Sequence, residues 1–143
     1  MRNMKKLFIL SFIIMSYAQP SFACETENYS LIESYANASL VFEGKSLNGT
    51  KVINKKTMES ESNFQINKIR KSHIGVLPEG AEYMTLYGSG DCVAQFTKGE
   101  EYLVYAIMEE DGEYKFFSAY SYAGSKTLKE ATKDLIFLRY QRD

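Results

Sequence analysis

The sequence predicts a mainly β domain: a five-stranded barrel of the oligosaccharide/oligonucleotide-binding (OB) type, with a short N-terminal helix and a C-terminal helix. Two observations lead to this prediction. Five segments have the composition and alternation of strands and are separated by short polar or glycine-containing turns, which favours an antiparallel barrel, and five strands suit the OB fold. Helical patterns flank these strands, one before the first and one after the last.

The first helix is expected over residues 28–38. Ser30 is suited to cap its N-terminus, because Glu33 follows at the spacing of a capping box. Three residues then fall on one face of the helix at i, i+4 and i+7: Leu31, Tyr35 and Ala38.

The strands follow in five segments, expected at residues 40–45, 64–69, 82–87, 102–108 and 114–120. The turn signal Asn48-Gly49 closes the first of them. The polar stretch 51–62 has no helical stripe and is interpreted as a mobile loop or a weak hairpin. The nearly continuous apolar run 102–108 predicts a strand that is buried on both faces.

The last helix is expected to begin near Thr127, with Glu130 completing a second capping box. Its predicted buried stripe consists of Leu128, Ala131, Leu135 and Leu138.

Residues 1–23 have the features of a secretory signal peptide. Three basic residues and no acidic one precede an apolar run, and Ser21 and Ala23 supply small residues before a cleavage site. The apolar run is short for a membrane span. We therefore expect an exported protein, extracellular or periplasmic, with residues 24–143 as a single domain and no transmembrane span in the mature chain.

The charge of the predicted mature chain argues against polyanionic partners. Residues 24–143 carry 14 basic and 18 acidic side chains, and no basic patch emerges. Nucleic acid and anionic membrane surfaces are therefore not expected as partners.

Residue types that support catalysis or metal binding are scarce. His73 is the one histidine, and no nucleophile elbow, phosphate loop or usual zinc ligand set is present. We therefore predict that the protein is not an enzyme and has no cofactor and no intrinsic metal. The acidic residues at 100–101 and 109–111 are interpreted as solvated turn residues. The eleven tyrosines are interpreted as sheet and barrel residues, with a sugar- or peptide-binding tyrosine face as the alternative.

Two cysteines, Cys24 and Cys92, remain after the predicted cleavage. In an oxidising compartment a single disulfide between them is the favoured interpretation. Two alternatives stay open: two free buried thiols, or a lipidated Cys24, because bacterial lipoprotein signals also place cysteine directly after a small residue such as Ala23.

Several segments together resemble netrin-like domains, a group that includes the tissue inhibitors of metalloproteinases (TIMPs). They are Cys24 directly after the cleavage site, the short helix, ASLVFEGK at residues 38–45, Cys92, GEEYLVYA at residues 99–106 and the closing helix at residues 128–138. The similarity covers most of residues 24–139.

The resemblance implies an OB barrel flanked by helices, with Cys24 bonded to Cys92. In the inhibitors, the amine and carbonyl of the first residue chelate the catalytic zinc of the protease, a role that would pass to Cys24 here. Glu25 would enter the specificity pocket of the protease. Thr26, Asp91 and Val93, which flank the two cysteines, would widen the contact.

The chain differs from the inhibitors at two of these positions. They have a second cysteine where this chain has Thr26, and the partner of that cysteine would fall near Ala119; they also usually have a small or hydroxylated residue at the position of Glu25. The leading hypothesis is a secreted, non-enzymatic, TIMP-like inhibitor of a zinc metalloprotease. The alternative is a non-inhibitory envelope or surface module that binds a protein or a glycan, lipid-anchored through Cys24 in one version.

Overall fold

The computed structural model describes residues 24, 27–73, 77 and 80–141. The predicted signal peptide at residues 1–23 lies outside the described residues, as do Glu25 and Thr26.

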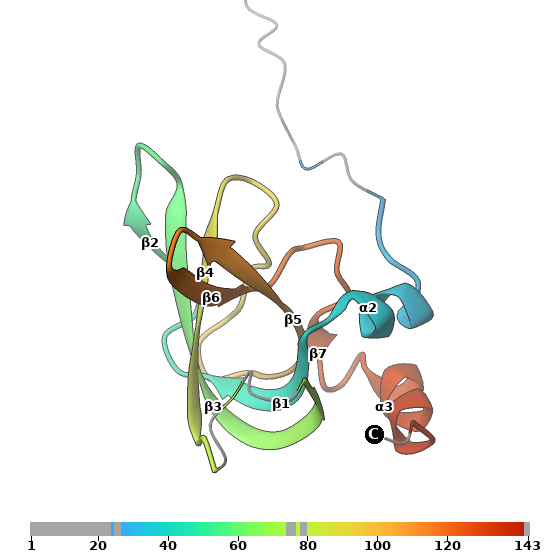
Figure 1. The fold of residues 1–143 in the computed structure, drawn as a ribbon. Coiled ribbons are helices and arrows are strands. Elements are labelled where there is room, and N and C mark those ends of the chain that lie inside the picture. Colours follow the sequence, from blue (N-terminus) through green and yellow to red (C-terminus); the bar gives the residue numbers. More distant parts are fainter. Residues whose placement is uncertain (1–23, 25–26, 74–76, 78–79, 142–143) are drawn as a thin grey trace, which may run out of the picture.

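Five strands close into a barrel (Figure 1). They are β1 (Leu40–Ser46), β3 (Glu59–Ser72), β4 (Tyr83–Ser89), β5 (Glu101–Asp111) and β6 (Tyr114–Ser118). Their order is β1-β3-β4-β6-β5, and an antiparallel pairing of β1 with β5 completes the circle. The mainly β, OB-like barrel predicted from the sequence is therefore confirmed.

One contact in the barrel is not antiparallel as expected. Strands β4 and β6 run parallel where Leu86 pairs with Phe117. The reason is the route of the chain: after β4 it crosses to β5, which pairs with β1, and the β5–β6 hairpin then returns β6 beside β4 in the same direction.

Two further strands extend the sheet beyond the five that were predicted. Strand β2 (Lys51–Asn54) forms a hairpin with the start of β3, where Lys51 pairs with Glu61 and Val52 with Ser60. Of the two interpretations of residues 51–62, the hairpin is thus confirmed and the loop is wrong. Strand β7 (Lys126–Thr127) pairs with β5 opposite Tyr102 and Leu103.

The capping box predicted for the first helix is present. Helix α2 spans Leu31–Asn37, the Glu33 N–H donates to Ser30 Oγ at 3.3 Å, and the Ser30 N–H donates to Glu33 Oε2 at 2.7 Å. Each side chain thereby satisfies a backbone donor that the first helical turn leaves without a partner.

The capping box predicted for the last helix is wrong. Helix α3 spans Thr132–Arg139, and Ala131 at its N-cap makes no side-chain hydrogen bond. Thr127 lies in β7 instead, and the Leu128 N–H donates to the Glu101 carbonyl at 3.0 Å. Pairing with β5 therefore keeps the chain extended where the local sequence favoured a helix start.

The apolar residues form two cores, on either side of the barrel wall. Phe42, Phe64, Val104 and other buried residues fill the barrel interior. Alternate residues of the same strands, Val41, Leu103 and Tyr105, pack outward against Ala131 and Leu138. Figure 1 shows α2 and α3 together on the side of β5 and β7, away from β2. The prediction that β5 is buried on both faces is confirmed for residues 102–106.

The predicted burial of the stripe of the last helix is also confirmed, since Ala131 and Leu138 are buried and Leu128 and Leu135 pack against the same core. Its placement on one helix is confirmed only for Leu135 and Leu138, because Leu128 lies in the turn before α3 and Ala131 is the N-cap. The stripe contains one residue that was not expected, Asp134, which is 3% exposed. Its carboxylate accepts from the Tyr105 hydroxyl at 2.6 Å and from Lys126 Nζ at 2.9 Å. Burial and this carboxylate raise the pKa of Tyr105 above its ordinary value.

Replacing Asp134 by alanine is expected to lower the free energy of unfolding by about 3 kcal/mol. The change removes the acceptor of the Tyr105 hydroxyl and the counter-charge of Lys126, and breaking a buried pair from one side has an effect of this size. Urea denaturation of wild type and variant measures it. Asp134→Asn retains an oxygen acceptor and should cost clearly less; equal losses would show that the carboxylate charge alone matters.

Candidate functional site

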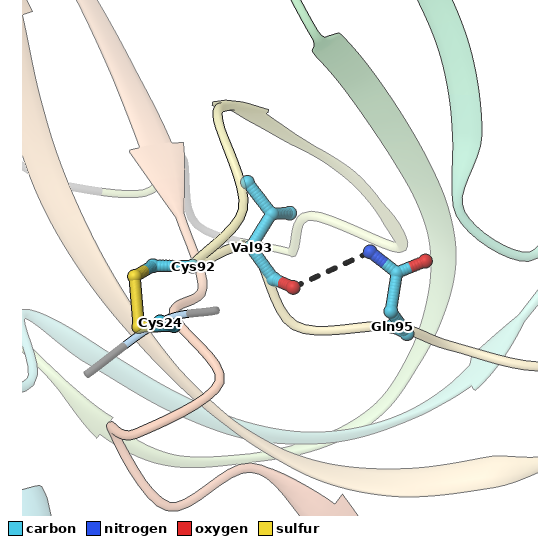
Figure 2. Close-up of a disulfide and its surroundings, with 4 residues drawn as sticks. All are labelled: Cys24, Cys92, Val93 and Gln95. Atoms are coloured by element: carbon cyan, nitrogen blue, oxygen red, sulfur yellow. Dashed lines mark hydrogen bonds between the residues drawn. A yellow bond between two sulfur atoms is a disulfide. The ribbon is translucent and has the colours of Figure 1, made fainter. Parts of the chain in front are cut away.

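The predicted disulfide is present and joins the start of the described chain to the middle of the fold. Cys24 is bonded to Cys92 across 68 residues of sequence, with 5.0 Å between the two Cα atoms (Figure 2). No cysteine of the chain is free. The alternative of two free buried thiols is therefore wrong.

Cys92 belongs to the segment between β4 and β5, and this segment is held against the chain that follows β6. The Cys92 carbonyl accepts from the Ser121 N–H at 2.8 Å, and the Ala94 N–H donates to the Ala119 carbonyl at 2.9 Å. Between them, Val93 forms an antiparallel bridge with Tyr120. Cys24 is thus attached to a hydrogen-bonded part of the barrel and not to a free loop. We call this part, residues 92–94 and 119–121, the disulfide edge.

The two predicted contact residues beside Cys92 differ in exposure. Asp91 is exposed, whereas Val93 is 9% exposed. The Val93 side chain packs over Gly88, where an added Cβ would come within 2.7 Å of a Val93 methyl carbon. Its carbonyl accepts from Gln95 Nε2 at 3.3 Å, as Figure 2 shows. Asp91 therefore offers a side chain to a partner at this edge, whereas the Val93 side chain is buried against the barrel.

Three tyrosines connect the segment that follows Cys24 to the same edge. The Tyr29 ring packs edge-on against Tyr122 at 5.3 Å, and the Tyr122 ring stacks on Tyr120 at 5.4 Å. The Tyr29 N–H also donates to the Tyr122 carbonyl at 2.8 Å. These contacts hold the segment before α2 in addition to the disulfide.

The interpretation of the tyrosines as sheet and barrel residues is confirmed for five of them. Tyr102 and Tyr105 are buried, while Tyr83, Tyr87 and Tyr114 lie in β4 and β6 with exposed side chains. Tyr140, after α3, is also exposed. The alternation in β4 predicts this exposure, because Met84 and Leu86 face the core and the tyrosines on either side of this pair, Tyr83 and Tyr87, must then face outward.

A cavity of about 540 Å³ opens between the β2–β3 hairpin and the β5–β6 hairpin. Aromatic side chains contribute much of its wall: Tyr87 from β4, Tyr114 and Phe116 from β6, and Tyr120 from the following segment. Nothing in the local sequence pattern indicated this cavity, because its walls come from four separate stretches of the chain.

Glu109 lies in the wall of this cavity, and its interpretation as a solvated turn residue is wrong. It is part of β5, is half-buried, and pairs across the hairpin with Phe116. Its Oε1 accepts a hydrogen bond from the Tyr120 hydroxyl. Its neighbours Glu110 and Asp111 are exposed, as are Glu100 and Glu101.

Burial, followed by the hydrogen bond and charge of Glu109, raises the pKa of Tyr120 to about 12. Well below pH 10, its ordinary pKa, the hydroxyl is protonated in both the folded and the unfolded chain. At higher pH the unfolded chain releases the proton while the folded chain retains it, so stability falls between pH 10 and about 12. In Tyr120→Phe the free energy of unfolding should fall less steeply over this pH range. Urea unfolding between pH 9 and about 11.5 measures the slope. An unchanged slope would contradict the assignment of this loss to the Tyr120 hydroxyl.

Other chemistry is sparse in the described part of the chain. His73 is exposed at the end of β3, and the described residues contain no group of three or more His, Cys, Asp or Glu side chains that could hold a metal ion. Neither of the described helices is both long and apolar enough to cross a bilayer.

Comparison with models of known protein families gives no match, and comparison with curated proteins gives none either. The disulfide edge and the cavity beside it are therefore the features from which a function can be proposed.

Proposed function

We propose that the chain is an exported, non-enzymatic, TIMP-like protein whose first mature residue, Cys24, chelates the zinc of a metalloprotease. The observation that supports this most directly is the Cys24–Cys92 disulfide, because the netrin-like resemblance requires a bond between the first mature residue and the middle of the barrel. Release of Cys24 as an N-terminus by signal cleavage after Ala23 is part of the proposal.

The chemistry of such a terminus suits zinc. An α-amine has a pKa of about 8, low enough to offer a lone pair near neutral pH. The disulfide and the hydrogen bonds around Cys92 hold the terminus in place, which lowers the conformational entropy lost on binding. The carbonyl of the same residue would supply the second ligand.

The two departures from the inhibitors define what the contact would look like. Ala119, near which their second disulfide would attach, is 3% exposed and lies in the barrel core, and Thr26 offers no sulfur; the terminus would therefore depend on one bond. Glu25 would bring a carboxylate toward the catalytic glutamate of the protease, which is unfavourable. We expect Glu25→Thr to strengthen inhibition by about tenfold.

Intact mass, before and after reduction, tests the premise. A mass that begins at Cys24 and rises by about two hydrogens on reduction means that the amine is free and the bridge is formed. A mass with an added diacylglycerol and acyl chain would overturn the proposal, because a lipidated Cys24 has neither a free amine nor a sulfur for Cys92.

Inhibition itself is tested with a panel of zinc metalloproteases and two forms of the protein. One begins at Cys24 and the other carries one additional alanine before it, which moves the amine away from the zinc while the disulfide remains. Inhibition by the first form only is expected. Equal inhibition by both forms, or by neither, contradicts the chelation mechanism.

The second candidate is a non-inhibitory surface module that binds another protein or a glycan through the barrel face. The aromatic and acidic cavity between the two hairpins favours it, since ligand sites are concave and combine apolar walls with a few polar groups.

A further inference from the structure

We propose that the cavity between the β2–β3 and β5–β6 hairpins binds an arginine side chain of a partner protein. The proposal does not depend on zinc chelation by Cys24, and it would hold for an inhibitor or for a surface module. It rests on the rings, the charges and one carboxylate in the cavity wall.

The cavity exposes ring surface that is available to a ligand. Tyr114 is 79% exposed and Tyr87 is 43% exposed, and both line the cavity together with Phe116 and Tyr120. A guanidinium group stacks on such rings and is attracted by their π electrons. The Tyr120 ring is fixed by its stacking on Tyr122, so one wall is preorganised.

The charge of the cavity is negative and largely uncompensated. Three carboxylates line it, those of Glu59, Glu109 and Asp111, against one cation, Lys115. Lys115 is directed to another acid, since its Nζ lies 3.5 Å from Glu110 Oε1. Within the described residues, none of the three lining carboxylates forms an ion pair of its own. A cationic ligand therefore complements the cavity.

Glu109 offers an oxygen positioned for such a ligand. The Ser118 hydroxyl lies 2.6 Å from the Tyr87 carbonyl and 3.2 Å from Glu109 Oε2. A hydroxyl has one proton, and the shorter distance favours donation to the carbonyl. Glu109 Oε1 accepts from Tyr120, while Oε2 shares the Ser118 hydroxyl with the Tyr87 carbonyl and keeps the capacity to accept a further hydrogen bond.

Arginine fits this arrangement better than the other candidate ligands. Its planar guanidinium can stack on a ring and donate to a carboxylate at the same time, whereas a lysine ammonium is a compact point charge that is strongly hydrated. A neutral sugar could stack on the tyrosines, but it would cover the carboxylates without compensating their charge, which is costly.

The cavity is also close to the disulfide edge. Ser89, which precedes Cys92 by three residues, lines the cavity. Tyr120 also lines it, and the same residue forms the β-bridge with Val93 beside Cys92. A protein that contacts the edge at Cys24 thus passes next to the cavity, which makes a partner protein a natural source of the arginine.

The test is an NMR titration of the mature protein, residues 24–143, with the capped peptide acetyl-Gly-Arg-Gly-amide. We expect amide shifts confined to the cavity, at Glu109, Phe116 and Tyr120, with a dissociation constant of about 1 mM. The matching lysine peptide should bind at least about threefold more weakly.

Variants separate this site from general attraction between charges. Glu109→Gln keeps the size of the side chain and should weaken arginine binding by about fivefold or more. Glu101→Gln removes one carboxylate at the other end of the same strand and should leave binding unchanged. Tyr114→Ser, at a position too exposed to affect folding, should weaken binding by about threefold.

Three results would overturn the proposal. The first is the absence of cavity shifts with the arginine peptide, and the second is an equal loss in Glu109→Gln and Glu101→Gln. The third is a set of cavity shifts with a neutral oligosaccharide, such as N-acetylchitotriose, and none with arginine. Because no protease is present in this titration, its outcome is separate from that of the inhibition assay.

Discussion

Replacing both Cys24 and Cys92 by alanine is expected to lower the free energy of unfolding by about 4 kcal/mol. The bond spans 68 residues of sequence, and closing a loop of that length restricts the unfolded chain by about this amount in the chain-entropy model. The folded barrel should persist, because its strand pairings and its core do not involve either sulfur. Urea denaturation of the oxidised wild type and the double variant measures the difference.

Two controls assign the effect to the bond. Reduction of the wild type should reproduce the stability of the double variant, and reductant should have no effect on the double variant itself. A loss below about 1 kcal/mol would contradict the prediction. It would mean that the unfolded chain retains structure, so that the bond restricts it less than the chain-entropy model assumes.

The strands were predictable because their signal is local. Alternation along residues 64–69 and the apolar run at 102–108 are properties of short windows, and both segments are strands in the structure. The first capping box is equally local, since Ser30 and Glu33 satisfy each other within one turn.

The errors occur where a distant part of the chain determines the local conformation. Thr127 and Glu130 have capping-box spacing, but β7 pairs with β5 and the Leu128 N–H donates to Glu101, which is distant in the sequence. Asp134 was missed for a similar reason. Its partner Tyr105 comes from β5, and an isolated helix pattern cannot show that a carboxylate on the buried face has a donor.

The two parts of the candidate site, the disulfide and the cavity, also differ in whether the sequence could predict them. The disulfide followed from the number of cysteines and the expected compartment, without any geometry. The cavity depends on the register of the β5–β6 hairpin, which places Glu109 opposite Phe116 and within reach of Tyr120. In the sequence, Glu109 begins an acidic run before Gly112 and therefore looked like part of a turn.

Replacing Phe64 by alanine is expected to lower the free energy of unfolding by about 4 kcal/mol, the usual cost of removing a fully buried phenylalanine. The side chain is fully buried at the centre of the barrel. Its ring packs edge-on against Phe42 at 5.5 Å, Phe96 at 4.8 Å and Tyr102 at 6.3 Å. Removal leaves a cavity bounded by rings from three other segments. It also removes aromatic pairs whose stabilising free energy exceeds that expected from their buried area alone.

The matched control is Tyr83→Ala, on strand β4 next to β3, where the ring is 63% exposed. Its effect should stay within about 0.5 kcal/mol, and Phe64→Leu should cost less than Phe64→Ala because it refills part of the space. Chemical denaturation of the three variants tests this order. Because Phe64 packs against residues of β1 and β5 and of the segment after Cys92, it joins the barrel closure to the disulfide segment. If Phe64→Ala cost no more than Tyr83→Ala, the ring cluster would not be the centre of the core.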